Sequence, residues 1–222
     1  MPSPAGMGSF LSRLSLRKLP GLAHFFYIQR IRGFDPPVQP LLDDDTGAWL
    51  ADRLKSTKLY LEFGSGGSTV LANRLGISSI TVESDRFYAA SVRRALPYPQ
   101  KATILTPDMG LTGPWGMPIF SREMKGPRYV GAPFGLLGDR FPDFIFVDGR
   151  YRIACVLESA RQAAAAKATA TVLLDDYAGR PGYHVLEHHL GKPELIGRAA
   201  AFVIGQAPVS RDDLCLHLSD PG

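Results

Sequence analysis

The sequence predicts a three-layer α/β sandwich with a mostly parallel sheet of about seven strands and an antiparallel C-terminal strand. Short apolar segments with strand character alternate with segments of helical periodicity, the order found in parallel sheets with right-handed crossovers. Gly-rich and acidic motifs follow several strand segments directly, at the sheet edge where α/β proteins bind ligands. With 222 residues, 45% of them hydrophobic, the chain is long enough for one such domain.

The strand segments are apolar or β-branched runs bounded by turn residues. We expect strands at 58–63, 80–83, 102–105, 144–147, 171–174, 200–204 and 214–218. The segment at 144–147 is apolar throughout, which is typical of a strand covered on both faces. The last two segments, joined by a turn, provide the antiparallel end of the sheet.

Helices are expected between these strands, at 41–54, 68–75, 85–96 and around 153–160. The last of them repeats apolar residues at helical spacing. Acids at 43–45 suit the positive end of a helix dipole, and Asp85 can cap the helix that it begins. Residues 107–142 are rich in Gly and Pro and are predicted to form a long irregular region, of a length that is usually either functional or disordered.

Residues 1–34 are predicted to be a basic amphipathic arm, and residues 35–222 the folded domain. The arm carries arginines and lysine without any acid, namely Arg13, Arg17, Lys18, Arg30 and Arg32. A Pro-rich linker at 35–40 follows it. Two alternatives remain open: the arm covers one edge of the domain, or it lies on an anionic membrane.

Composition narrows the possible functions. The net charge is only +4, and much of the basic excess lies in the arm, so nucleic acid is not an expected partner. Cys155 and Cys215 form no metal or disulfide pattern and are expected to be buried. Because no apolar stretch is long enough to cross a bilayer, we expect a cytoplasmic protein, peripheral to a membrane if the arm binds lipid.

The segment after the first strand carries the strongest functional signal. Residues 62–69 read EFGSGGST, and Glu83 ends the second strand 19 residues beyond Gly64. Glycines allow a tight turn and close backbone approach, and an acid about 20 residues later accepts ribose hydroxyls. A phosphate P-loop is excluded because its lysine is missing, and a dinucleotide site lacks its third glycine, here Thr69. A third candidate ligand, S-adenosylmethionine, has no phosphate and so needs no phosphate-binding loop. Its sulfonium and ammonium groups are cationic and would suit the carboxylate of Glu62, just before the turn.

On these motifs the sequence resembles the class I S-adenosylmethionine-dependent methyltransferases, which have a Rossmann-like fold. The resemblance covers roughly residues 58–190 and rests on the segments at 62–69, 82–84, 106–109 and 146–150. The segments VDG and LLDDY are similar to those of small-molecule or sugar O-methyltransferases and imply a bacterial branch near them. The motifs of base N-methylating and cytosine C5 enzymes are missing.

The resemblance implies a cofactor site along the first two strands. Glu62 would face the methionine end, Glu83 and Ser84 the ribose, and Asp108 and Met109 the adenine. The turn would be formed by Gly64, Ser65, Gly66, Gly67, Ser68 and Thr69, with Asp148 also beside the cofactor.

Three carboxylates, Asp148, Asp175 and Asp176, follow two predicted strands and are the candidate catalytic groups. They provide a general base, with Asp148 as the first choice, or together a Mg²⁺ site, since that ion prefers oxygen ligands. The expected acceptor is a small molecule or saccharide, bound by Trp115, Arg150, Tyr151, Arg152, Tyr177 and Arg180. An NAD-dependent oxidoreductase and a non-catalytic, membrane-associated nucleotide-binding protein are the alternatives.

Overall fold

One sheet with the strand order β3-β2-β1-β4-β5-β7-β6 organises the computed structural model, which describes residues 19–119, 125–206 and 208–222. Its strands are β1 Leu59–Phe63, β2 Ser78–Val82, β3 Ala102–Leu105, β4 Phe144–Val147, β5 Ala170–Leu174, β6 Glu194–Ile196 and β7 Ala199–Ile204. The first five are parallel, β7 runs antiparallel to β5, and β6 runs antiparallel to β7. The predicted fold class is therefore confirmed.

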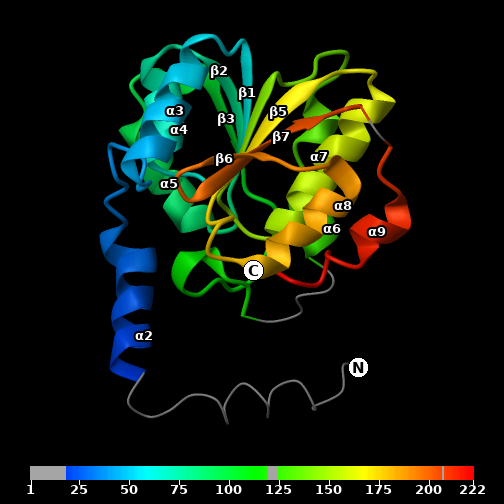
Figure 1. Ribbon diagram of the computed structural model, residues 1–222. Coiled ribbons are helices and arrows are strands. Elements are labelled where there is room, and N and C mark those ends of the chain that lie inside the picture. Colours follow the sequence, from blue (N-terminus) through cyan, green and yellow to red (C-terminus); the bar gives the residue numbers. More distant parts are fainter. Residues whose placement is uncertain (1–18, 120–124, 207) are drawn as a thin grey trace, which may run out of the picture.

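Helices cover both faces of the sheet (Figure 1). On one face lie α3 Asp44–Lys55, α4 Gly67–Arg74 and α5 Arg86–Ala95; on the other lie α6 Gly126–Gly131, α7 Arg152–Ala165, α8 Glu187–Leu190 and α9 Arg211–Cys215. Short 3-10 turns occur at Pro99–Lys101, Pro114–Gly116, Phe134–Leu136 and Pro181–Leu186. The predicted cap at Asp85 is confirmed, because its side chain accepts from the Phe87 and Tyr88 N–H groups. Asp43, predicted only as an acid suited to the helix dipole, also caps its helix by accepting from the Thr46 N–H.

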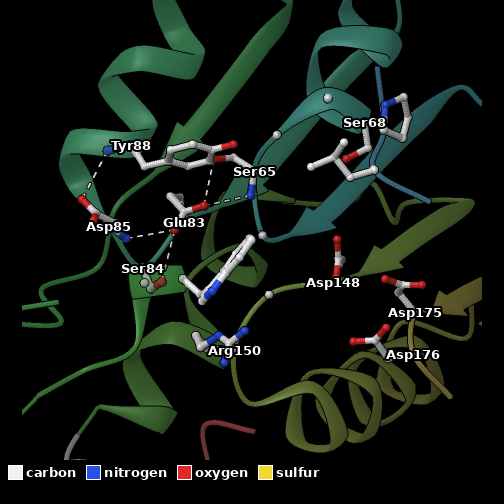
Figure 2. Close-up of a pocket in the computed structure, with 18 of the residues that line it drawn as sticks. Ser65, Ser68, Glu83, Ser84, Asp85, Tyr88, Asp148, Arg150, Asp175 and Asp176 are labelled. Atoms are coloured by element: carbon white, nitrogen blue, oxygen red, sulfur yellow. Dashed lines mark hydrogen bonds between the residues drawn. The ribbon is translucent and has the colours of Figure 1, made fainter. Parts of the chain in front are cut away.

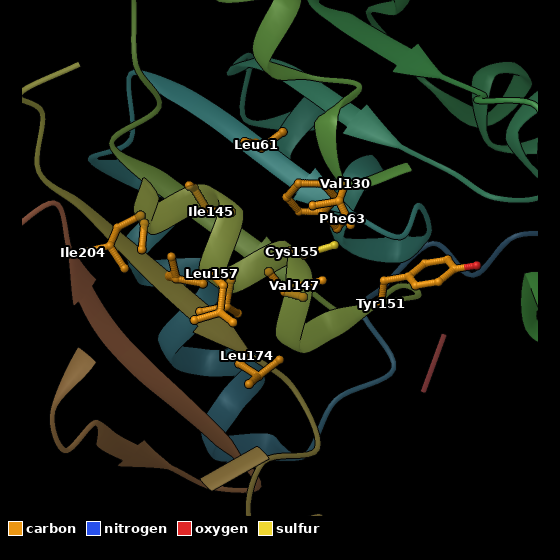
Figure 3. Close-up of a cluster of buried hydrophobic side chains, with 14 of the residues drawn as sticks. Leu61, Phe63, Val130, Ile145, Val147, Tyr151, Cys155, Leu157, Leu174 and Ile204 are labelled. Atoms are coloured by element: carbon orange, nitrogen blue, oxygen red, sulfur yellow. The ribbon is translucent and has the colours of Figure 1, made fainter. Parts of the chain in front are cut away.

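The largest part of the core lies between the sheet and α7 (Figure 3). Phe63 of β1, Val147 of β4 and Leu157 of α7 are completely buried there. Cys155 lies among them, as expected, whereas Cys215 is exposed, so the prediction of burial was wrong for that residue.

The end of the chain differs from the prediction. Residues 211–215 form α9 rather than a strand, because Ser210 caps the helix by accepting from the Asp213 N–H, and Asp212 and Asp213 fill its first turn. The seventh strand is instead β6, which pairs with β7 across a two-residue turn, Gly197-Arg198. Gly197 has a φ of +54°, a conformation that glycine adopts without strain.

The described part of the chain begins with α2, Leu19–Tyr27, and continues as a π-helical turn, η2, Ile28–Arg32. Figure 1 shows α2 extending beyond the sheet from the side of α5. The basic residues Arg13, Arg17 and Lys18 lie outside the described residues. Within residues 19–119, 125–206 and 208–222, no helix has the length and apolar character needed to cross a membrane.

Candidate functional site

A cavity of about 910 Å³ lies at the carboxyl ends of β1, β2, β4 and β5. The loops that follow these strands form its floor, and the linker before α3 contributes Pro37, Pro40, Leu41 and Leu42 to one wall. Parallel strands bring their carboxyl ends to one edge, which is why residues far apart in the sequence meet here. Ligand sites of proteins typically enclose about 300–1,000 Å³, so the cavity has the size of a binding site.

The glycines of the turn between β1 and α4 have different functions. Gly64 has a φ of +98°, and a Cβ there would lie 2.7 Å from Cα of Gly149 in the loop after β4. A Cβ on Gly67 would lie 2.0 Å from the Gln39 carbonyl oxygen. These two glycines therefore permit close packing of neighbouring backbone. They also line the cavity, together with Ser65, Gly66 and Ser68.

The carboxylate of Glu83 lies in the cavity wall and accepts four hydrogen bonds (Figure 2). Its Oε2 accepts from the Ser65 N–H at 2.9 Å and the Ser65 hydroxyl at 2.8 Å. Its Oε1 accepts from the Asp85 N–H at 2.9 Å and the Ser84 hydroxyl at 3.1 Å. Burial raises the pKa of Glu83 above its ordinary value, and these donors partly offset that shift.

Glu62 lies behind the turn and not in the cavity. It is completely buried and accepts from the hydroxyls of Ser68, Thr69 and Thr81. Burial raises its pKa to about 7, and the hydroxyl donors oppose that rise. The structure therefore does not bring Glu62 to the methionine end of a cofactor; the carboxyl group instead fastens the start of α4 to β1.

Replacing Glu62 with glutamine should therefore affect stability more than ligand binding. The amide retains one acceptor oxygen but presents N–H groups where hydroxyls now donate, so the free energy of unfolding should fall by about 1–3 kcal/mol. Urea unfolding measures this change. A loss of S-adenosylhomocysteine affinity in a variant of unchanged stability would contradict this assignment and place Glu62 at the ligand.

Figure 2 shows the carboxylates of Asp148, Asp175 and Asp176 across the cavity from Glu83. Each of the three is paired with an arginine. Arg198 binds both oxygens of Asp175, at 2.8 and 2.6 Å. Arg152 donates to Asp148 at 2.8 Å and to Asp176 at 3.0 Å. Burial, together with the Asp175 carboxyl beside it, raises the pKa of Asp148 to about 7, although Arg152 opposes the shift.

This pairing corrects the magnesium prediction. Among the described residues, no three His, Cys, Asp or Glu side chains are grouped so that they could hold a metal ion. The guanidinium groups of Arg152 and Arg198 occupy the oxygens that a cation would need. Sequence spacing placed the carboxylates at one sheet edge correctly but could not show that arginines neutralise them.

Arg152 holds neighbouring loops together and has no N–H group left to bind a ligand. All five of its N–H donors are used within the protein, on Gly149, Asp148, Asp175 and Asp176. Arg150 differs, because its buried Nε has no partner and its Nη1 reaches the Gly222 carbonyl only at 3.5 Å. Burial lowers the pKa of Arg150, and the neighbouring Arg152 charge adds to this effect. Arg150 therefore retains donors for a ligand.

The other predicted acceptor-binding residues are divided between cavity and core. Arg180 and Trp115 line the cavity, and the indole of Trp115 is 85% exposed. Tyr151 is completely buried in the core (Figure 3), and Tyr177 is buried with its hydroxyl donating to Glu187. The structure does not bring these two tyrosine rings into the cavity.

Asp108 and Met109 lie beside the main cavity rather than in it. They line a second, smaller cavity that shares Ser84 with the first. Met109 is buried and packs in the core, whereas Asp108 is exposed and accepts from the Gly110 N–H at 2.9 Å.

Backbone strain is concentrated around the main cavity. Trp115, Tyr151 and Asp176 have φ values of +59°, +55° and +61°. Non-glycine residues in this left-handed region cost free energy and are common at functional sites. All three lie in, or directly beside, loops that border the cavity.

Tyr88 and Arg198 are among the cavity-lining residues that the sequence analysis did not identify as site residues. Tyr88 lies one turn into α5, where its position after the Asp85 cap was the available signal; burial and the Glu83 charge raise its pKa to about 12. Arg198 lies in the turn of the β6–β7 hairpin. That hairpin was not predicted, so nothing in the sequence indicated that Arg198 reaches Asp175.

No family model and no curated protein sequence matches the chain. Among solved structures, it is similar to a methyltransferase-like protein from Silicibacter pomeroyi DSS-3, at 33% identity and a TM-score of 0.75. That comparison covers 83% of this chain and 100% of the other. The cofactor-bound protein Rv0187 from MTB has 14% identity and a TM-score of 0.54, over 93% of this chain and 99% of the other, and is similar in fold alone.

Proposed function

The chain belongs to the class I S-adenosylmethionine-dependent methyltransferases, and from this premise we propose that it methylates a hydroxyl oxygen of a small molecule or saccharide. The main observation behind the proposal is that carboxylates line two opposite sides of one cavity. Glu83 lies on one side, with four donors on its carboxylate, and Asp148, Asp175 and Asp176 lie on the other (Figure 2).

The Glu83 environment fits the ribose of S-adenosylmethionine. Each carboxylate oxygen accepts one backbone N–H and one serine hydroxyl, from Ser65 or Ser84. A ribose has two neighbouring hydroxyls, which can take the places of the two serine hydroxyls while the backbone N–H groups stay in place. The two serine hydroxyls thus mark the positions of the diol, and both belong to flexible rotors that can turn away.

Asp148 is the proposed general base. When bound, S-adenosylmethionine supplies an electrophilic methyl group on its sulfonium sulfur. The Asp148 carboxylate takes the proton of the acceptor hydroxyl as the oxygen–carbon bond forms and the carbon–sulfur bond breaks. A pKa near 7 suits this task, because such a group is both partly ionised and basic at neutral pH. Arg152 fixes the carboxylate in position.

The remaining side chains of the cavity suit a methyl acceptor that carries hydroxyl or anionic groups. Asp176 and Arg180 form an ion pair at 3.2 Å and are both partly exposed to the cavity. Carboxylate and guanidinium groups side by side can accept from and donate to sugar hydroxyls. Arg150, which has unused donors, suits a carboxylate or phosphate on the methyl acceptor, or the carboxylate of the cofactor.

Calorimetric titration with S-adenosylhomocysteine tests the cofactor. We expect saturable binding in the micromolar range, with no binding of NAD⁺ in a parallel titration. The same dissociation constant is expected with and without Mg²⁺, since arginines balance the carboxylates. Absence of S-adenosylhomocysteine binding would remove the proposal, and a tighter constant with Mg²⁺ would restore the carboxylates as metal ligands.

A further inference from the structure

The helix α2 is apolar on every side and projects from the rest of the molecule (Figure 1). Apart from His24 and the hydroxyl of Tyr27, it carries no polar side chain. Phe25 faces the domain, where its ring centroid lies 6.0 Å from that of Phe34. A helix that is apolar all round is normally buried, so the outer side of α2 needs a cover that the described part of the chain does not provide.

An exposed apolar stripe runs along the outer side of α2 and continues into η2. Ala23, Tyr27 and Ile31 are exposed and follow one another at four-residue spacing, which places side chains on one face of a helix. Tyr27 is 50% exposed and Ile31 is 75% exposed, although both side chains are large. We refer to these three residues as the α2 stripe.

Two more exposed apolar side chains lie at the main cavity, which α2 borders through Phe25. The indole of Trp115 is 85% exposed, and the side chain of Leu41 is 70% exposed. Indole rings favour the interface between membrane and water, because the ring is apolar and its N–H is polar. Exposed apolar groups therefore gather where α2 meets the cavity.

The unpaired charges beside the α2 stripe are positive. Arg30 of η2 and Arg86 of α5 are exposed, and their guanidinium groups lie 5.6 and 4.9 Å from the ring centroid of Phe87. Neither forms an ion pair with any residue that the structure describes, whereas Arg32 pairs with Asp35 at 2.7 Å. Two cations that share one ring and lack an acid suit an anionic partner.

We propose that α2 and η2 dock the protein on an anionic phospholipid surface. The α2 stripe enters the headgroup region, and Arg30 and Arg86 lie against the lipid phosphates. Residues 1–34 contain no aspartate or glutamate, so the sequence around the stripe adds no repulsion. A second copy of the chain is a poorer occupant, because a symmetric contact would bring the same positive groups face to face. Since Phe25 of α2 lines the main cavity, docking holds that cavity beside the lipid surface.

Co-sedimentation of the full chain with lipid vesicles tests the proposal. One set of vesicles is phosphatidylcholine alone, and the other also contains phosphatidylglycerol. We expect binding to the neutral vesicles to be at least about tenfold weaker, since each basic group near an anionic surface contributes about fivefold in affinity. Raising the salt concentration from about 0.1 to about 1 M shortens the Debye length from about 10 to about 3 Å and should release most of the bound protein.

Surface variants assign the binding to this face. Ile31→Asp replaces an exposed apolar group with an acid and should weaken binding to the anionic vesicles at least about tenfold. Arg30→Gln and Arg86→Gln should each weaken it about fivefold. The matched controls are Leu195→Asp and Arg74→Gln, which change exposed residues of β6 and α4 and should pellet as the wild type does. Thermal unfolding shows that each variant is folded.

Three results would overturn the proposal: no binding to the anionic vesicles, equal binding to both kinds of vesicle, or an Ile31→Asp variant that pellets like the wild type. Analytical ultracentrifugation examines the other occupant of the α2 stripe. A wild-type dimer that Ile31→Asp dissociates would assign this face to a second copy of the chain and reject the lipid surface.

Discussion

Replacing Asp148 with asparagine should lower the rate of methyl transfer by roughly 10²- to 10⁴-fold, the usual contribution of a general base. Asparagine keeps the shape of the side chain and an oxygen for Arg152, which donates to Asp148 Oδ1 at 2.8 Å, but it cannot take a proton. Release of S-adenosylhomocysteine in the presence of a hydroxylated acceptor measures the rate. Affinity for S-adenosylhomocysteine should remain within about threefold of wild type, since the proposed ribose acceptor is Glu83 and not Asp148.

The pH dependence gives an independent check on Asp148. Only the ionised carboxylate accepts the proton, so the wild-type rate should rise with pH up to about 7 and then level off. Asp175→Asn removes a neighbouring negative charge that raises the pKa of Asp148, and should therefore move this rise to lower pH. A wild-type rate that does not vary between pH 5 and 8, or an Asp148→Asn variant of normal rate, would exclude Asp148 as the base.

Glu83→Ala should weaken binding of S-adenosylhomocysteine by about 100-fold or more. The variant loses two hydrogen bonds from ribose hydroxyls to a carboxylate, each worth about 1.5–3 kcal/mol. It also leaves the Ser65 and Asp85 N–H groups without their present acceptor. Calorimetric titration gives the dissociation constant, and thermal unfolding of the same preparation shows that the variant is folded.

A suitable control for this prediction is Glu194→Ala, since that acid is exposed on the edge strand β6 and does not line the main cavity. It should bind S-adenosylhomocysteine as the wild type does. Because burial raises the pKa of Glu83, wild-type affinity should begin to fall at a higher pH on acidification than for an ordinary glutamate. An unchanged dissociation constant in Glu83→Ala would refute the ribose assignment.

The carboxylate cluster shows where prediction from sequence reaches its limit. Asp148 and Asp175 follow strands that were predicted closely, so their meeting at one sheet edge was foreseeable. The choice between a metal site and ion pairs was not, because it depends on Arg198, which comes from a hairpin 23 residues beyond Asp175. No local pattern links the two residues; only the pairing of β7 with β5 brings them together.

The alternation of strands and helices, the cap at Asp85 and the glycine turn followed by Glu83 could all be predicted from the sequence. These features depend on hydrophobic periodicity and on backbone hydrogen bonds between near neighbours, which any stretch of sequence displays locally. Two other features depend on how the whole chain folds: Glu62 accepts from hydroxyls behind the turn, and Gln29 lies beside Asp85, 56 residues away in the sequence. Burial and long-range contacts fix those positions, and a side chain's charge or polarity does not reveal which partner the folded chain will bring to it.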